Sequence, residues 1–287
     1  MSIIVTLDMY SGRQNPSWEL SEADAKKFVK MMSKRKEIST TTSPGSLGKL
    51  GYRGLVVTHA TTPVASDIMQ LRVFDGIVES ASLAVPNLID NDSEVEAFLI
   101  DAAGNALSSD EVSFIKGEVE KNVKGGVANS FLQFEMLAAP PFNPTKWNSS
   151  DAVRLNNNCY NYANDKITNT FAQPGRGSGQ EGPYPPTCPG TGQAAVRDGQ
   201  IVVKNPDVSP ADGQIVALVV SSTPGFFDYH WYRRDSNGMW SHKPGQTPAK
   251  NTDNSGKTIS NPETCDRGPY NLFCGYFNSI PSKTTIR

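Results

Sequence analysis

The chain has 287 residues, of which 37% are hydrophobic and 20% charged, and its formal net charge at pH 7 is −2. This length suffices for two domains, whereas the near-neutral charge without a dense basic block argues against nucleic acid as a partner. No stretch reaches the ~18 apolar residues of a membrane span, and no secretory signal peptide is visible. We therefore expect a soluble protein without a membrane span, either cytoplasmic or exported by a leaderless route.

Residues 1–125 are predicted to form an N-terminal α+β domain. Strands are expected at 3–7, 55–58 and 69–74. A helix is expected to begin at Ser21, with Ala25, Phe28, Val29 and Met32 on one buried face, and further helices at 94–100 and 110–123. The pattern does not identify the fold of this domain, which we interpret as a targeting or regulatory module that contacts a protein partner.

A segment rich in Gly and Pro is predicted to separate this domain from the rest of the chain. Lys124-Gly125-Gly126 ends the preceding helix, and Pro140, Pro141 and Pro144 favour an extended backbone. We place a linker at 126–147 and a second domain at 148–287. Three of the four Trp and seven of the nine Tyr lie beyond residue 146, so aromatic side chains are concentrated there.

Cys159 is predicted to lie in the first turn of a helix that runs to about residue 167. Asn156-Asn157-Asn158 reads as a loop that ends in an Asn cap. The partial positive charge at a helix N-terminus lowers the pKa of a thiol, and this position suits a nucleophile. The alternative interpretation is a buried, inert thiol or half of a disulfide.

Two strands of the second domain are predicted to carry histidines. A turn at Asp212-Gly213 leads into a buried strand, and the next strand, 228–235, contains His230. The chain then turns at Ser236-Asn237-Gly238 and returns through His242.

The length of this turn decides how the two histidines are arranged. Side chains alternate along a strand, so His230 and His242 share a face only if the loop has an odd number of residues. A three-residue loop with Gly238 at positive φ meets this condition and places Tyr232 opposite His242. A two-residue Asn237-Gly238 turn would put the histidines on opposite faces and would pass the orienting role to a residue such as Asp228.

This order of motifs resembles the papain-fold amidases of the NlpC-like and CHAP groups, over about residues 147–250. These enzymes have a cysteine at a helix start, a turn into a strand, a base histidine, and a polar orienting residue on the next strand. The resemblance implies Cys159 as nucleophile, His230 as general base and His242 as orienting residue. It also implies a papain-like α+β domain with an antiparallel sheet and no cofactor.

Other residues of the predicted site follow from the same resemblance. Asn158 and Asn157 are expected to position the substrate or stabilise the oxyanion. Aromatic side chains are expected to line a substrate groove: Trp147, Tyr160, Trp231 and Trp240. We expect no metal, because the cysteines and histidines lack the close paired spacing of a zinc site. Near the C-terminus an aromatic cap is expected, pinned by a Cys265–Cys274 bridge.

The predicted function is a thiol hydrolase that cleaves an amide or isopeptide bond, with a peptidoglycan-like peptide as the favoured substrate. Such a cysteine peptidase would suit a secreted effector or toxin. One alternative is a non-enzymatic recognition or toxin protein with an aromatic binding face. Another is a Cys–His acyltransferase or transglutaminase-like enzyme, which would use the same two residues.

Overall fold

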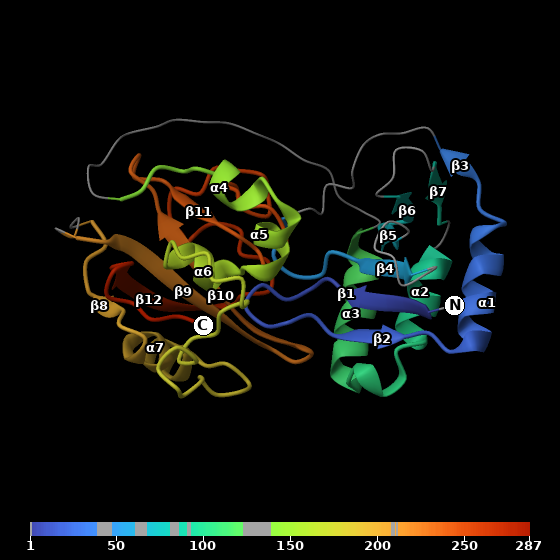
Figure 1. The fold of residues 1–287 in the computed structure, drawn as a ribbon, viewed down its shortest axis with the longest axis horizontal. Coiled ribbons are helices and arrows are strands. Elements are labelled where there is room, and N and C mark those ends of the chain that lie inside the picture. The colour runs from blue at the N-terminus through green and yellow to red at the C-terminus, as the bar shows by residue number, and fades with distance from the viewer. Residues whose placement is uncertain are drawn as a thin grey trace. The chain divides into compact units, whose positions relative to one another are not determined.

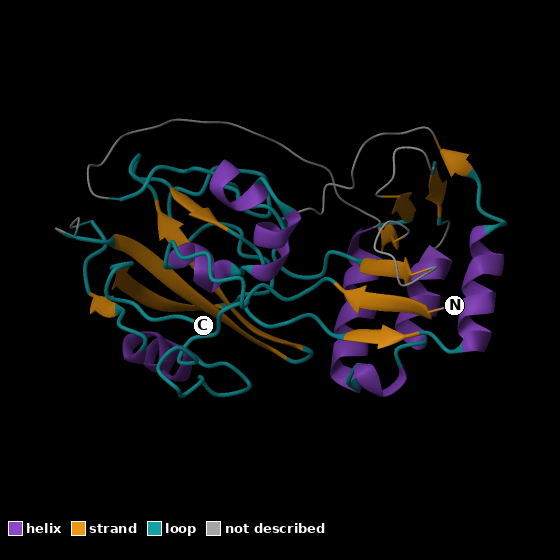
Figure 2. Cartoon of the chain, in the orientation of Figure 1, coloured by secondary structure: helices purple, strands orange, loops and turns teal. Residues whose placement is uncertain are grey.

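A computed structural model describes residues 2–38, 48–60, 68–80, 86–90, 93–122, 139–207, 210 and 212–287 (Figure 1). The chain divides into two units. The first takes Met1–Met9, Asn15–Leu47 and Tyr52–Gly125, and the second takes Tyr10–Gln14, Gly48–Gly51 and Gly126–Arg287. Each unit combines helices with one antiparallel sheet (Figure 2), so the fold class is α+β.

Unit 1 is built on a seven-stranded sheet with the order β2-β1-β4-β5-β6-β7-β3. Its strands are β1 (Ser2–Leu7), β2 (Ser17–Glu19), β3 (Glu37–Ile38), β4 (Leu55–Ala60), β5 (Ile68–Phe74), β6 (Ile77–Ser80) and β7 (Asn87–Ile89). Its helices are α1 (Glu22–Met32), α2 (Glu94–Asp101), the short 3-10 helix η3 (Gly104–Ala106) and α3 (Ser109–Asn122). The three strands and three helices predicted for this part of the chain are confirmed within two residues, and the largest difference is at β4, which runs two residues beyond its predicted end.

Helix α1 begins where the sequence predicts it. The Ser21 side chain accepts the backbone N–H of Asp24 at 3.1 Å, which satisfies a donor that the helix itself leaves unpaired. Ala25 and Phe28 are buried, but Val29 is 46% exposed. The buried face of α1 is therefore narrower than its apolar periodicity indicates.

A buried carboxyl group lies inside unit 1. Glu96 of α2 is 1% exposed, and its Oε1 accepts the hydroxyl proton of Tyr52 at 2.6 Å. Burial raises the pKa of Glu96 to about 7, because the charged form loses its hydration. The stability of this unit should therefore depend on pH.

Unit 2 is built on a five-stranded sheet with the order β11-β10-β9-β12-β8. Its strands are β8 (Ile201–Val203), β9 (Gln214–Thr223), β10 (Phe226–Arg234), β11 (Trp240–His242) and β12 (Leu272–Ser279). Its helices are α4 (Thr145–Asn148), α5 (Asp151–Asn156), α6 (Cys159–Ala163) and α7 (Cys188–Arg197). Strand β9 lies between β10 and β12, and its continuous apolar run is buried on both faces.

The main core of unit 2 lies on one face of this sheet. Figure 1 shows α6 beside β9 and β10, and α6 and α7 both contribute side chains to the same cluster. The members of the cluster are Cys159, Tyr160, Ala163, Ala172, Ala195, Val216, Leu218, Val220, Tyr229, Trp231, Phe277 and Ile286.

A disulfide joins α7 to β12 through Cys188 and Cys274, which lie 86 residues apart in the sequence. The predicted Cys265–Cys274 bridge is therefore wrong. Cys265 is a free, partly buried thiol whose Sγ lies 4.0 Å from the Tyr232 hydroxyl. Cys188 is the first residue of α7, and because α7 packs against β12 it lies close enough to bond to Cys274. The sequence did not indicate this pairing.

Part of the predicted linker, residues 126–138, lies outside the described residues. Its last residues, 145–147, belong to α4, which begins at Thr145 and buries Trp147 against Tyr162 and Ala249. Among the residues that the structure describes, no helix is long and apolar enough to cross a membrane.

Candidate active site

The hairpin between β10 and β11 has the predicted register. The N–H of Asp235 donates to the carbonyl of Met239 at 2.8 Å, which leaves a loop of three residues. Gly238 has a φ of 78°, and Tyr232 lies opposite His242 across the ladder. Both features are confirmed, and they place His230 and His242 on the same face of the sheet.

The two histidines form a chain of hydrogen bonds. Nε2 of His230 lies 2.8 Å from Nδ1 of His242, and Nε2 of His242 lies 3.0 Å from the carbonyl oxygen of Thr252. A carbonyl only accepts, so Nε2 of His242 carries the proton and its Nδ1 is an acceptor. His230 must then donate from Nε2, which leaves the lone pair of its ring on Nδ1.

Burial keeps His242 neutral. Both histidines are fully buried, and burial, with the charge of Lys250 as a lesser cause, holds the pKa of His242 well below its usual value. Aromatic rings fix the imidazoles: Tyr232 stacks on His242 with centroids 5.1 Å apart, and Tyr270 lies 5.7 Å from His230. The packing thus holds the two imidazoles in the positions in which they contact each other.

Helix α6 is held at its start by two asparagines. Oδ1 of Asn158 accepts the N–H groups of Tyr160 and Asn161, while Oδ1 of Asn161 accepts the N–H of Asn158. This reciprocal cap confirms the predicted helix start. The helix ends at Ala163, earlier than predicted, because Asp165 takes a positive φ of 51°.

The loop before α6 is fixed by a buried lysine. Nζ of Lys243 donates to the carbonyl oxygens of Arg154, Asn157 and Gly245, each within 2.5–2.6 Å. The side chain of Asn157 is also engaged, since its Nδ2 donates to Val153 and Asn169. Asn157 and Asn158 therefore shape the loop and the helix start, while the Nδ2 of Asn158 donates to the carbonyls of Gly12 and Ala172.

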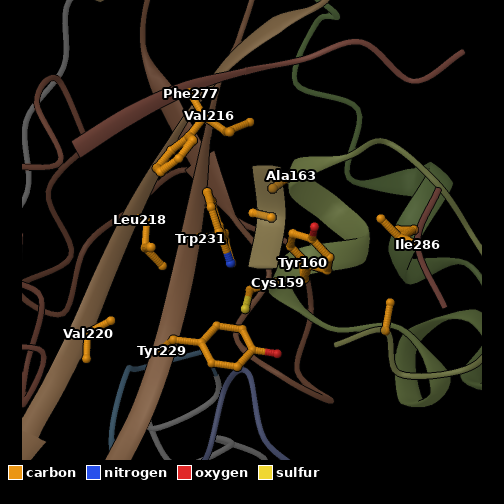
Figure 3. Packing of buried hydrophobic residues seen from close by; sticks show 12 residues of the cluster. Cys159, Tyr160, Ala163, Val216, Leu218, Val220, Tyr229, Trp231, Phe277 and Ile286 are labelled. Carbon is orange, nitrogen blue, oxygen red and sulfur yellow. The ribbon is translucent and has the colours of Figure 1, made fainter. Parts of the chain in front are cut away.

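The Cys159 thiol lies between Tyr229 and Trp231 of β10 (Figure 3). Burial, followed by the nearby charge of Asp228, raises the pKa of this thiol far above its usual value, whereas the backbone N–H of Trp231 and the charge of Lys243 act in the opposite direction. The expected lowering of the pKa is therefore wrong for this state. A five-residue helix supplies too little partial charge to offset complete burial.

Cys159 packs against the part of β10 that contains His230. The thiol packs on the side chains of Tyr229 and Trp231, whereas the side chains of Asp228 and His230 alternate with them along the strand. The Trp231 N–H places the sulfur at the edge of β10, beside the residue that follows His230. Cys159 and His230 thus lie at the same short stretch of β10, although their side chains are not on one face of the strand.

The four aromatic residues predicted to line a groove are core residues instead. Trp147, Tyr160 and Trp231 are fully buried and Trp240 is 4% exposed. Trp147 packs edge-on against Tyr162, and Trp240 packs against Tyr276, so these two lie in different parts of the unit. Their apolar rings are explained by burial, and this part of the prediction is wrong.

The structure adds a segment that the sequence did not indicate. The backbone of Ser11-Gly12-Arg13 lies against β10, where the carboxylate of Asp228 accepts from all three N–H groups at 2.6–3.2 Å. The carbonyl of Gly12 accepts from Asn158 Nδ2, Gln173 Nε2 and the hydroxyl of Tyr229. More than 140 residues separate these partners in the chain, so no local pattern points to their contact.

Within the described residues, no group of three or more His, Cys, Asp or Glu side chains could hold a metal ion. A surface cavity of about 440 Å³ lies along residues 253–266 and includes Cys265, but neither Cys159 nor the histidines line it. The chemistry available at the site is that of a thiol and imidazoles.

Comparison with known proteins gives one informative relative. The chain is 48% identical over 150 residues to insoluble matrix shell protein 1 of Ruditapes philippinarum, a match that covers 96% of that protein and 52% of this chain. This chain belongs to the family of insoluble matrix shell protein 1. No protein-family model matches the sequence, and no solved structure matches it.

The match leaves about half of this member of the insoluble matrix shell protein 1 family without a counterpart in the shell protein. The name of the relative describes where that protein is found and says nothing of a reaction. Chemical inferences about this family member therefore rest on the geometry around Cys159, His230 and His242.

Proposed function

We propose that unit 2 is a papain-like thiol hydrolase in which Cys159 attacks an amide carbonyl, His230 is the base and His242 orients it. The observation that carries the proposal is the chain from His230 Nε2 to His242 Nδ1 and on to the carbonyl of Thr252. His242, which the carbonyl of Thr252 holds in place, sets the tautomer of His230 and leaves Nδ1 of His230 basic.

The reaction follows from these protonation states. Nδ1 of His230 takes the thiol proton of Cys159 as the sulfur adds to the carbonyl carbon, and the backbone N–H of Cys159 stabilises the oxyanion. Collapse of the tetrahedral intermediate transfers the proton to the leaving amine and forms a thioester. Water then releases the acid, while an amine in its place would make the protein an acyltransferase. Peptides, including those of peptidoglycan, are the substrate class that we propose.

The test is turnover of a panel of peptide and isopeptide substrates, analysed by mass spectrometry. Cys159→Ala and His230→Ala should each abolish cleavage, and the double variant should be no slower than either, since nucleophile and base act as one unit. Cys265→Ala is the matched control, because it removes the other free thiol and should leave the rate unchanged. Full activity in Cys159→Ala would exclude the mechanism.

A second candidate is a structural protein of an extracellular matrix, favoured by the shell matrix relative and by the Cys188–Cys274 disulfide. Disulfides persist in oxidising compartments, so we propose secretion for either function. If the role is structural, wild type and the Cys159→Ala/His230→Ala variant should enter an insoluble matrix to the same extent, as measured by sedimentation with the mineral or polymer phase. A loss of incorporation that follows loss of the thiol would count against a purely structural role.

A further inference from the structure

We propose that the surface of unit 2 beside Cys159 is a binding site for a short, curved peptide with a glycine at its centre, and that Ser11-Gly12-Arg13 occupies this site in the structure. Such peptides are a substrate class for the proposed hydrolase. Cleavage of the bound peptide rests on that proposed function, whereas binding does not. Binding itself follows from contacts between main-chain groups and side chains of unit 2.

The first contact is a carboxylate that binds the peptide backbone. Asp228 is fully buried and accepts from the N–H groups of Ser11, Gly12 and Arg13, and its Oδ2 also accepts the hydroxyl proton of Tyr270. Three consecutive amides that converge on one carboxylate require the peptide to curve around it. These interactions do not depend on side chains, so another peptide backbone can make them.

The second contact is a carbonyl pocket. The oxygen of Gly12 accepts from Asn158 Nδ2 at 3.0 Å, Gln173 Nε2 at 2.8 Å and the Tyr229 hydroxyl at 3.2 Å. Asn158 caps the helix that begins with Cys159, and Tyr229 packs on the thiol. A carbonyl with three donors next to a thiol is the environment that a bound amide needs before attack.

The third contact selects glycine. A Cβ atom on residue 12 would lie 2.5–2.6 Å from the ring and the carbonyl oxygen of Tyr229, closer than side-chain carbons approach such atoms. The carbonyl oxygen belongs to β10, which is held in the sheet by its pairing with β9, and it cannot move aside easily. The site therefore excludes any larger residue at this position.

The next position favours a cation. The Arg13 guanidinium lies 4.1 Å from the ring centroid of Tyr10 and 4.4 Å from that of Tyr184, and it donates to the carbonyl of Phe227. Tyr184 is 66% exposed, and a cavity of about 100 Å³ opens between Arg13, Glu181 and Tyr184. The ligand class is a peptide that contains Gly followed by Arg or Lys.

Occupancy by the chain's own segment explains why the thiol is sealed. Two of the groups that bind Gly12 flank Cys159, since Asn158 precedes it and Tyr229 packs on it, and Cys159 has no exposed surface. An incoming peptide must displace Ser11-Gly12-Arg13, so the segment acts as a competitor held in the same chain.

The experiment measures alkylation of Cys159 by iodoacetamide in the full-length protein, read by mass spectrometry of the Cys159 peptide. Gly12→Val should expel the segment and accelerate alkylation by at least about tenfold. Gly117→Val is the matched control, because a Cβ at that position meets no atom within 4 Å. Added peptide Tyr-Ser-Gly-Arg-Gln should slow alkylation of Gly12→Val again, and Tyr-Ser-Val-Arg-Gln should not.

An unchanged alkylation rate in a folded Gly12→Val protein, or equal protection by both peptides, would overturn the proposal. If Gly12→Val does not fold, Arg13→Ala removes only the guanidinium contacts and should accelerate alkylation in the same direction by a smaller factor. These readouts need no turnover. If the protein binds the glycine peptide but cleaves no substrate, the binding site is supported and the proposed hydrolase is excluded. If the protein cleaves other amides and the glycine peptide does not compete with them, the hydrolase is supported and the binding site is excluded.

Discussion

Nδ1 of His242 lies 2.8 Å from Nε2 of His230, on adjacent strands joined by a three-residue loop. The carbonyl of Thr252 fixes the proton of His242 on Nε2, so both rings should be Nε2–H tautomers. Nitrogen-15 shifts of the two imidazoles, measured by NMR at pH 7, should show both Nδ1 atoms unprotonated. A proton on Nδ1 of His242 would reverse the direction of the chain and remove His230 as a base towards the thiol.

The two free thiols should differ in reactivity in the native wild-type protein. Cys265 is partly exposed and burial raises its pKa to about 11, whereas Cys159 is fully buried with its pKa raised further. At pH 8, iodoacetamide should label Cys265 faster than Cys159 by about tenfold or more. Peptide mass spectrometry over a time course measures both rates, and in 6 M urea the difference should vanish. Faster native labelling of Cys159 would mean that the site is open in solution.

The disulfide between α7 and β12 should contribute strongly to stability. It closes a loop of 86 residues, for which the loss of chain entropy in the unfolded state corresponds to about 4.6 kcal/mol. Cys188→Ser/Cys274→Ser should lower the free energy of unfolding by that order in urea titrations. Cys265→Ser, which removes a thiol outside the bridge, should change it little, and a reductant should affect wild type but not the double variant.

Unit 1 should lose stability as the pH rises. The pKa of Glu96 is about 7 in the fold against 4.5 for an ordinary glutamate, so the native state holds this proton more tightly than the unfolded state. The contribution is fully present below about pH 4.5 and is lost as the pH rises through 7, by about 3 kcal/mol. Urea unfolding at pH 4.5 and 7.5 should show this difference in wild type relative to Glu96→Gln. Parallel pH profiles of the two proteins would contradict it.

Local patterns were sufficient for the hairpin of unit 2. Strand periodicity, the turn chemistry of Ser236-Asn237-Gly238 and alternation along the strands predicted that His230 and His242 would meet, because all these signals lie within 13 consecutive residues. The cap at Asn158 was predictable for the same reason. In contrast, α7 contains Gly190 and Gly192 in its ten residues, and such a low helix propensity hides a helix that packs on the sheet.

The rest of the site depends on contacts that sequence distance conceals. Gly12 lies 146 residues before Asn158, and their contact exists only because a short N-terminal segment joins the second unit. Complete burial of Cys159 likewise arises from tertiary packing, and it reverses the pKa shift that its place at a helix start suggested. The groove prediction was wrong for Trp147 and Trp240 because aromatic side chains occur both in protein cores and on binding surfaces, and the sequence does not distinguish the two.

The order of the chain and the order of the units do not coincide, since Tyr10–Gln14 and Gly48–Gly51 belong to the unit that otherwise follows Gly125. Any gene fusion or duplication that copied only the later portion would leave the Asp228 carboxylate without three donors. It would also leave the Asn254 amide without the Leu50 backbone groups that it pairs with. A descendant shortened in this way would have to recruit water or a separate polypeptide to those positions, and evolution could thereby convert a built-in occupant into an external partner.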